Sequence, residues 1–202
     1  MLASLLALPL ASHAVAPRLA NVSPAGAQRG TEVEVRLAGS RLEDTKELVL
    51  YAPGLSLVKM DEPRTNLVKV TLKVAPDCRL GEHSLRLRTA TGVSELRTFW
   101  VGALPVLSET ETNSEPARAQ KVPLNTTVTG AIPADDQDFF QVTLAKGQRL
   151  SAEVEAMRLG RAIFDAALSI HDASGKLLAS ADDSILALQD PCLSFEIGRA
   201  HV

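Results

Sequence analysis

Hydrophobic and polar residues alternate along several short stretches in the first half of the chain. From Thr31 to Leu37, valine and leucine at every second position alternate with glutamate and arginine. The stretch from Asn66 to Val74 repeats the pattern with lysine and threonine, and Leu85 and Leu87 alternate with arginines. A period of two is that of a β-strand with apolar side chains on one face. We therefore expect antiparallel sheets with one buried and one wet side.

More strand-like runs lie between these stretches, and turn-forming glycine, proline and aspartate residues separate them. These runs are Arg18–Val22, Glu47–Tyr51, Leu55–Met60 and Ser94–Val101. About seven short strands at this spacing predict an immunoglobulin-like β-sandwich, which we assign to residues 17–104.

The second half continues with strand patterns after a change in composition. Residues 105–118 are rich in glutamate and proline and lack periodicity, which predicts an acidic linker between two domains. Strands are expected at 126–129, 139–144, 150–156, 167–171 and 177–181. The predicted fold class is therefore all-β, with two tandem β-sandwiches.

The first residues carry the pattern of a secretory signal. Residues 1–14 form an apolar run ending in Ser12-His13-Ala14, a small-x-small cleavage pattern, although no Lys or Arg precedes the run. The run is too short to span a membrane as a helix. We therefore expect a signal peptide at 1–14 and a secreted or cell-surface protein. Cys78 and Cys192 are then either a disulfide or, as we expect, two unrelated thiols.

Composition argues against several classes of function. The formal net charge of −3 gives no electrostatic reason to expect nucleic acid as a partner. Aromatic residues make up 3% of the chain, which is little for stacking on bases or sugars. No P-loop, GxGxxG, GxSxG or zinc-spaced His/Cys motif occurs, so we expect no catalytic activity in this chain.

Two segments of the first half resemble a known family. They are PRLANVSPAGAQRGTEVEVRLAGSRL, which contains a Ser-Pro-x-Gly turn followed by Gly-Thr-x-Val, and LGEHSLRLRTATGVSELRTFWV. Residues 17–102 are similar in these motifs to the IPT/TIG family of immunoglobulin-like domains. The resemblance implies the same sandwich that the alternation predicts.

The second half resembles another family from Glu109 to Phe195. A glutamate-rich lead, a Thr-x-x-Gly strand end, an Asp-x-x-Asp-Phe-Phe segment and a Lys-Gly-Gln turn are similar to the bacterial pre-peptidase C-terminal family. The resemblance implies a jelly-roll-like sandwich at 119–195, here incomplete. EIGRAHV, residues 196–202, resembles a reading frame of a sequencing adapter, so we expect an artefact there and further native strands after Phe195.

Acidic residues cluster on both sides of the predicted domain start. Glu109, Glu111 and Asn113 occupy alternate positions, which share one side of an extended segment. Three further acids, Asp135, Asp136 and Asp138, precede the strand at Phe139. Calcium takes six to eight oxygen ligands, and the two clusters together offer that chemistry. The alternative is a solvated acidic linker beside an aspartate-rich turn.

The family resemblance implies which of these residues bind the ion. Collagen-binding members of the pre-peptidase C-terminal family hold calcium with a Glu-x-Glu-x-Asn linker and an Asp-x-x-Asp pair. The matching residues here are Glu109, Glu111, Asn113, Asp135 and Asp138. A metal-bridged linker would also stiffen the joint between the domains.

We therefore expect a non-catalytic binding or spacer module of an exported bacterial protein, with calcium as its cofactor. The expected partner is a protein or an extracellular polymer. Three alternatives remain open: the non-catalytic portion of a secreted peptidase, a stalk of repeated sandwiches, and binding of collagen-like fibres. Fold alone does not decide between them.

Overall fold

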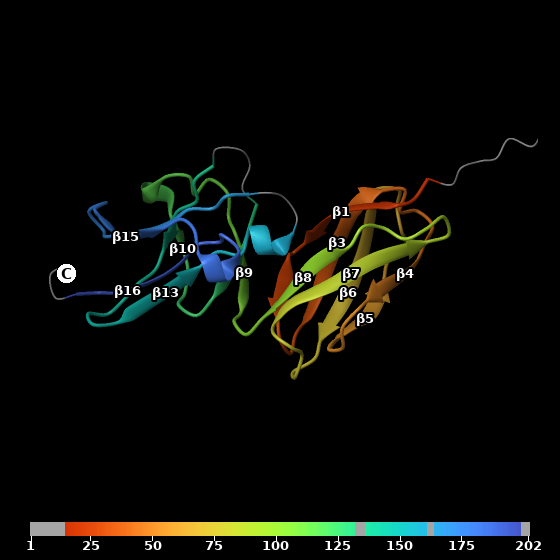
Figure 1. Ribbon diagram of the computed structural model, residues 1–202, viewed down its shortest axis with the longest axis horizontal. Helices are drawn as coiled ribbons and strands as arrows, with labels where there is room; N and C mark the ends of the chain where they lie inside the picture. Colours follow the sequence, from red (N-terminus) through yellow and green to blue (C-terminus); the bar gives the residue numbers. More distant parts are fainter. Residues whose placement is uncertain (1–14, 132–135, 161–163, 199–202) are drawn as a thin grey trace, which may run out of the picture.

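The computed structural model describes residues 15–131, 136–160 and 164–198 (Figure 1). The predicted signal segment 1–14 lies outside this part. Strands dominate, and the helical segments of the described chain are short 3₁₀ turns. The predicted all-β class is therefore confirmed.

Strands β1 to β8 form two four-stranded sheets, which we call the first sandwich. One sheet has the order β1-β3-β6-β5, with bounds Arg18–Ser23, Glu32–Ser40, Leu67–Val74 and Leu55–Met60. The other has the order β2-β8-β7-β4, with bounds Gly26–Gln28, Arg97–Gly102, Gly81–Thr89 and Thr45–Leu50. All pairings are antiparallel except that of β2 with β8.

The alternation in the sequence matches the observed burial. In β6, Val68, Val70, Leu72 and Val74 are at most 2% exposed, whereas the lysines between them reach solvent. The inward faces of both sheets supply one continuous hydrophobic core. Burial of these faces drives the two sheets together, at roughly 25 cal/mol per Å² of apolar surface.

Strand β2 was not predicted, and its sequence explains why. Gly26, Ala27 and Gln28 have no alternation and little β-propensity. A Cβ atom on Gly26 would lie 2.1 Å from the carbonyl oxygen of Trp100 in β8. The residue is therefore a glycine because two backbones approach closely there.

The two cysteines are both free thiols, as expected. Cys78 is buried in the core of the first sandwich, and Cys192 is exposed in β16. The Cys78 Sγ lies 3.6 Å from the Nε2 of buried His83. The His83 Nε2 is also 2.7 Å from the carbonyl oxygen of Arg79, so this histidine belongs to the core of the sandwich.

Strands β9 to β16 form two-stranded sheets, which we call the second unit. The parallel pairs are β9–β11 (Val106–Ser108, Thr127–Thr129) and β10–β12 (Gln120–Lys121, Phe140–Gln141). The antiparallel pairs are β13–β16 (Arg149–Glu153, Cys192–Glu196) and β14–β15 (Leu168–His171, Leu177–Ala181). The 3₁₀ turns are η1 (Pro116–Arg118), η2 (Met157–Leu159) and η3 (Ile185–Ala187).

The second unit departs from the strand prediction at several points. The strand expected at 139–144 is only Phe140–Gln141, and β9 lies inside the segment predicted as linker. Glu196, expected to be an artefact, pairs with Arg149 through the β13–β16 ladder, while residues 199–202 lie outside the described part. The buried apolar residues in its described part are small or few, among them Ala166, Ala187 and Leu193 at 5–8% exposure, so its core is thin.

Candidate metal centre

The glutamate-rich segment is fixed to the second unit where β9 ends. The backbone N–H of Glu109 donates to the carbonyl oxygen of Thr129 (2.9 Å), which extends the β9–β11 pairing by one residue. The Glu109 Oε2 accepts a hydrogen bond from the backbone N–H of Ala131 (3.2 Å). The extended backbone then breaks at Thr112, whose φ is 77°. Glu109, Glu111 and Asn113 therefore do not share one straight strand.

The aspartate loop lies directly against this segment. The backbone N–H of Phe139 donates to the carbonyl oxygen of Asn113 (2.9 Å). The Ser114 hydroxyl donates to Oδ1 of Asp136 (3.3 Å). The fold thus brings together two acidic clusters that are more than twenty residues apart in the sequence. Asp135 lies outside the described residues.

Asn113 is the most buried polar side chain at this junction, with 1% exposure. The Asn113 Nδ2 donates to Oε1 of Glu109 (3.1 Å), so the Asn113 Oδ1 points away from Glu109. The Oδ1 atoms of Asn113 and Asp138 are both buried and have no hydrogen-bond partner among the described residues. A buried oxygen without a partner costs about 1–3 kcal/mol. Such atoms call for a missing partner.

The charges around Asp138 are a second sign that a partner is missing at this junction. Burial raises the pKa of this carboxyl to about 6, and the charges of Glu109, Asp136 and Glu111 and a hydrogen bond with the Glu109 side chain contribute to the shift. Each of these factors disfavours the ionised form of Asp138. A bound cation would reverse this balance, because it favours carboxylates near one another.

The described residues at this junction offer oxygen donors, but their carboxylates do not form a group of three whose oxygens lie within 4.8 Å of one another. Glu109, Asn113 and Asp138 present carboxylate and amide oxygens at one junction, and two of these oxygens are buried and unpartnered. Calcium is bound by such hard oxygen donors. Glu111, whose side chain is exposed, and Asp135 complete the predicted set. Asp136 Oδ1 accepts from Ser114 and from the backbone N–H of Gln137, and both carboxylate oxygens of Glu109 likewise accept a hydrogen bond.

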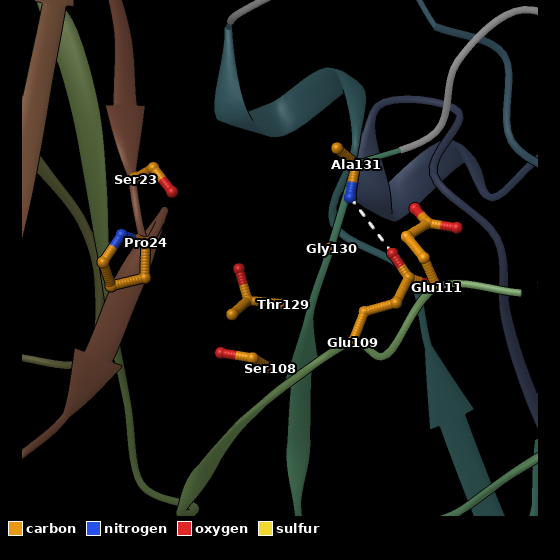
Figure 2. Close-up of a pocket in the computed structure, with 8 residues that line it drawn as sticks. All are labelled: Ser23, Pro24, Ser108, Glu109, Glu111, Thr129, Gly130 and Ala131. Carbon is orange, nitrogen blue, oxygen red and sulfur yellow. Dashed lines mark hydrogen bonds between the residues drawn. The ribbon is translucent and has the colours of Figure 1, made fainter.

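A cleft of about 320 Å³ borders this junction. Figure 2 shows Ser23 and Pro24, at the end of β1, facing Ser108 and Thr129 across it. Glu109 and Glu111 line the same cleft on the side of the second unit. Two of the predicted ligands, Glu109 and Glu111, therefore border a cleft between the first sandwich and the second unit, whereas Asn113 and Asp138 do not line it.

A second acidic cluster in the described chain was not predicted as a site. Carboxylate oxygens of Asp165, Asp182 and Asp183 all lie within 4.8 Å of one another, and all three residues are exposed. Asp172 instead organises the β14–β15 turn. Its Oδ1 accepts hydrogen bonds from the backbone N–H groups of Ser174 and Lys176. Contact between residues so far apart as Asp165 and Asp182 leaves no local signal in a sequence.

Comparisons with known proteins do not assign this chain to a family. No family model matches the chain, and no curated protein matches it. One solved structure that matches is "Bacteroides ovatus mixed-linkage glucan utilization locus (MLGUL) SGBP-B in complex with mixed-linkage heptasaccharide", at 12% identity and a TM-score of 0.32. The alignment covers 92% of this chain and 47% of that protein, so this chain spans about half of its length.

A second match is "Structure of the S-layer protein SbsC, domains 5-6", at 10% identity and a TM-score of 0.32. It covers 92% of this chain and 100% of that one. Within the described residues, no helix has the length and apolar character needed to cross a membrane.

Proposed function

We propose that this chain is a non-catalytic module of an exported bacterial protein, in which calcium ties the acidic segment after β9 to the loop before β12. Its partner is a protein or an extracellular polymer, and its two halves are related to the IPT/TIG and pre-peptidase C-terminal families. The observation that carries the proposal is the pair of buried, unpartnered oxygens on Asn113 and Asp138 beside Glu109.

The ion would be held by Glu109, Glu111, Asn113, Asp135 and Asp138, and its charge would offset the repulsion among their carboxylates. Asn113 positions Glu109 through its amide hydrogen bond, and the backbone of Asn113 accepts from Phe139. These contacts join the two segments before any ion binds. A binding role agrees with the cleft, since a ligand entering it would meet residues of both halves.

Thermal unfolding of the full chain in calcium and in EDTA tests this proposal. For an extracellular module with a Kd of about 10⁻⁴ to 10⁻³ M, calcium at ~10 mM stabilises the folded state by about 1.4 to 2.7 kcal/mol. We expect Asp138→Asn to abolish the rise in Tm, because it removes one carboxylate ligand. Isothermal titration with calcium chloride gives the affinity directly.

Asp182→Asn is the matched control, since it removes a carboxylate from the other acidic cluster. We expect this variant to keep the full response to calcium. Equal Tm values in calcium and EDTA for the unmodified chain would refute the proposal. Loss of the response in Asp182→Asn, with retention in Asp138→Asn, would assign calcium to the other cluster and also refute it.

A further inference from the structure

Two residues of β8, Thr98 and Trp100, present their side chains to the outer face of the first sandwich. Phe99 and Val101 are fully buried in the core. Alternate residues of a strand point to opposite faces, so Thr98 and Trp100 lie on the outer face of this sheet. Thr98 is nevertheless only 9% exposed, because another part of the chain covers it.

The covering segment is residues 154–160 of the second unit, which we call the docking loop. It contains η2, the cyan coil that lies against β8 between the two halves (Figure 1). The Thr98 hydroxyl donates to the carbonyl oxygen of Leu159. The Arg158 guanidinium lies over the Trp100 ring, with its central carbon 5.7 Å from the ring centroid. These are a polar and a cation–π contact between residues about sixty positions apart.

Asp190 holds the docking loop in this shape. Its carboxylate is 1% exposed and accepts hydrogen bonds from the backbone N–H groups of Ala156 (3.0 Å), Met157 (2.7 Å) and Arg158 (3.2 Å). Its Oδ2 also accepts from Nε of Arg158 (2.9 Å). Backbone and side chain of the loop are thus fixed by one buried carboxylate.

The Arg158 side chain is held from other directions as well. Its Nη2 donates to Oε1 of Glu153 (2.7 Å) and to the carbonyl oxygen of Val154 (2.8 Å). The side chain is 17% exposed. The planar fork of arginine donates in several fixed directions, so these acceptors orient the guanidinium plane. It is presented to Trp100 with little rotational freedom left.

We propose that the docking loop is an intramolecular clamp that fixes the second unit against the outer face of β8. The segment after β8 is the covalent connection between the halves, and a single connection leaves a joint free to turn. The contacts of Arg158 and Thr98 add a second attachment point away from that connection. The clamp uses none of the candidate calcium ligands, so it holds the joint in the absence of calcium.

Trp100 is the only tryptophan in the sequence, so its fluorescence reports on the clamp. The experiment uses the full chain in EDTA and compares emission, acrylamide quenching and the radius of gyration from small-angle scattering. Arg158→Ala should shift Trp100 emission to longer wavelength, increase quenching and increase the radius of gyration. Arg149→Ala, which removes an exposed ion pair with Glu196, is the matched control and should change none of them.

Two variants on the first sandwich leave Asp190 and Arg158 in place. Thr98→Val removes the hydroxyl donor at constant shape and should change the same three quantities in the same direction. Trp100→Leu should increase the radius of gyration, whereas Tyr51→Leu, at an exposed aromatic residue at the end of β4, should not.

The proposal would be overturned if Arg158→Ala and Thr98→Val both kept the emission, quenching and radius of gyration of the unmodified chain. A changed emission with an unchanged radius of gyration would overturn it as well, because the contact would then not hold the halves together. If Arg158→Ala unfolds the second unit, Thr98→Val and Trp100→Leu decide the question by the same criteria.

Discussion

Two aspartates of the second unit, Asp138 and Asp190, show how environment separates chemically identical residues. Burial by itself raises the pKa of Asp190, but hydrogen bonds from Arg158 and the backbone of Met157 and Ala156 bring it below its usual value. Asp138 is half-buried, but carboxylates surround it and its pKa rises to about 6. Asp190 is therefore a satisfied structural anion, whereas the surroundings of Asp138 disfavour its ionised form.

A stability measurement without calcium distinguishes these two states. Asp138→Asn should raise the Tm in EDTA at neutral pH, because it removes a buried charge that Glu109 and Asp136 repel. Asp190→Asn should lower the Tm, because it breaks the ion pair with Arg158 and weakens the acceptor for three backbone N–H groups. A lower Tm for Asp138→Asn in EDTA would contradict this account of the site.

Glu155, in the docking loop, makes the stability of the folded state depend on pH, and the direction of that dependence can be worked out. Burial raises its pKa from 4.5 to about 7, against the opposing charge of Arg158. Between these values the folded state binds more protons than the unfolded state, so the stability contributed by this group is lost as pH rises.

Glu155→Gln should therefore raise the Tm relative to the unmodified chain, and more at about pH 8 than at about pH 5. Differential scanning calorimetry across this range measures the difference. Glu62→Gln, at an exposed glutamate of the first sandwich, is the control for general loss of charge. A constant difference in Tm across the range would rule out Glu155 as the titrating group.

At the scale of elements, β6 is the centre of the first sandwich. It pairs with β3 on one side and with β5 on the other, and four of its side chains enter the core. The period-two pattern of a strand is decided by its own sequence, because burial of one face needs only alternation. This is why the alternating stretches that become β3 and β6 were predicted near their observed bounds.

Truncation of one core leucine measures this contribution. Leu72→Ala should lower the free energy of unfolding by about 2 to 5 kcal/mol, since Leu72 is fully buried in β6. Leu57→Ala on the neighbouring strand β5 should cost much less, because Leu57 is 39% exposed. Urea unfolding curves give both values, and equal losses would contradict the assigned burial.

The elements of the second unit were harder to predict. Strands β9, β10 and β12 are two or three residues long, too short for a period of two to emerge. They exist because partners far along the chain pair with them, as Thr127–Thr129 pairs with Val106–Ser108. Pairing of this kind is a property of the whole fold and leaves little trace in either segment.

At the scale of the molecule, the two halves meet at a cleft and at a clamp. The cleft places Ser23 and Pro24 opposite the acidic segment, and the clamp places Arg158 over Trp100. A module attached at two points presents its cleft with a fixed shape, which lowers the entropic cost of binding a partner. The proposed calcium site would add a third constraint at the same joint.

The sequence by itself determined the all-β class, the strands of the first sandwich except β2, and the residues of the candidate site. Each of these depends on residues close together in the chain: alternation, turn residues, and acids spaced within a few positions. Tertiary structure alone decided that Asn113 is buried beside Glu109, and that Asp190 and Arg158 form one network against Trp100. Burial and contact between distant segments depend on how whole sheets pack, and no local pattern of residue types encodes that arrangement.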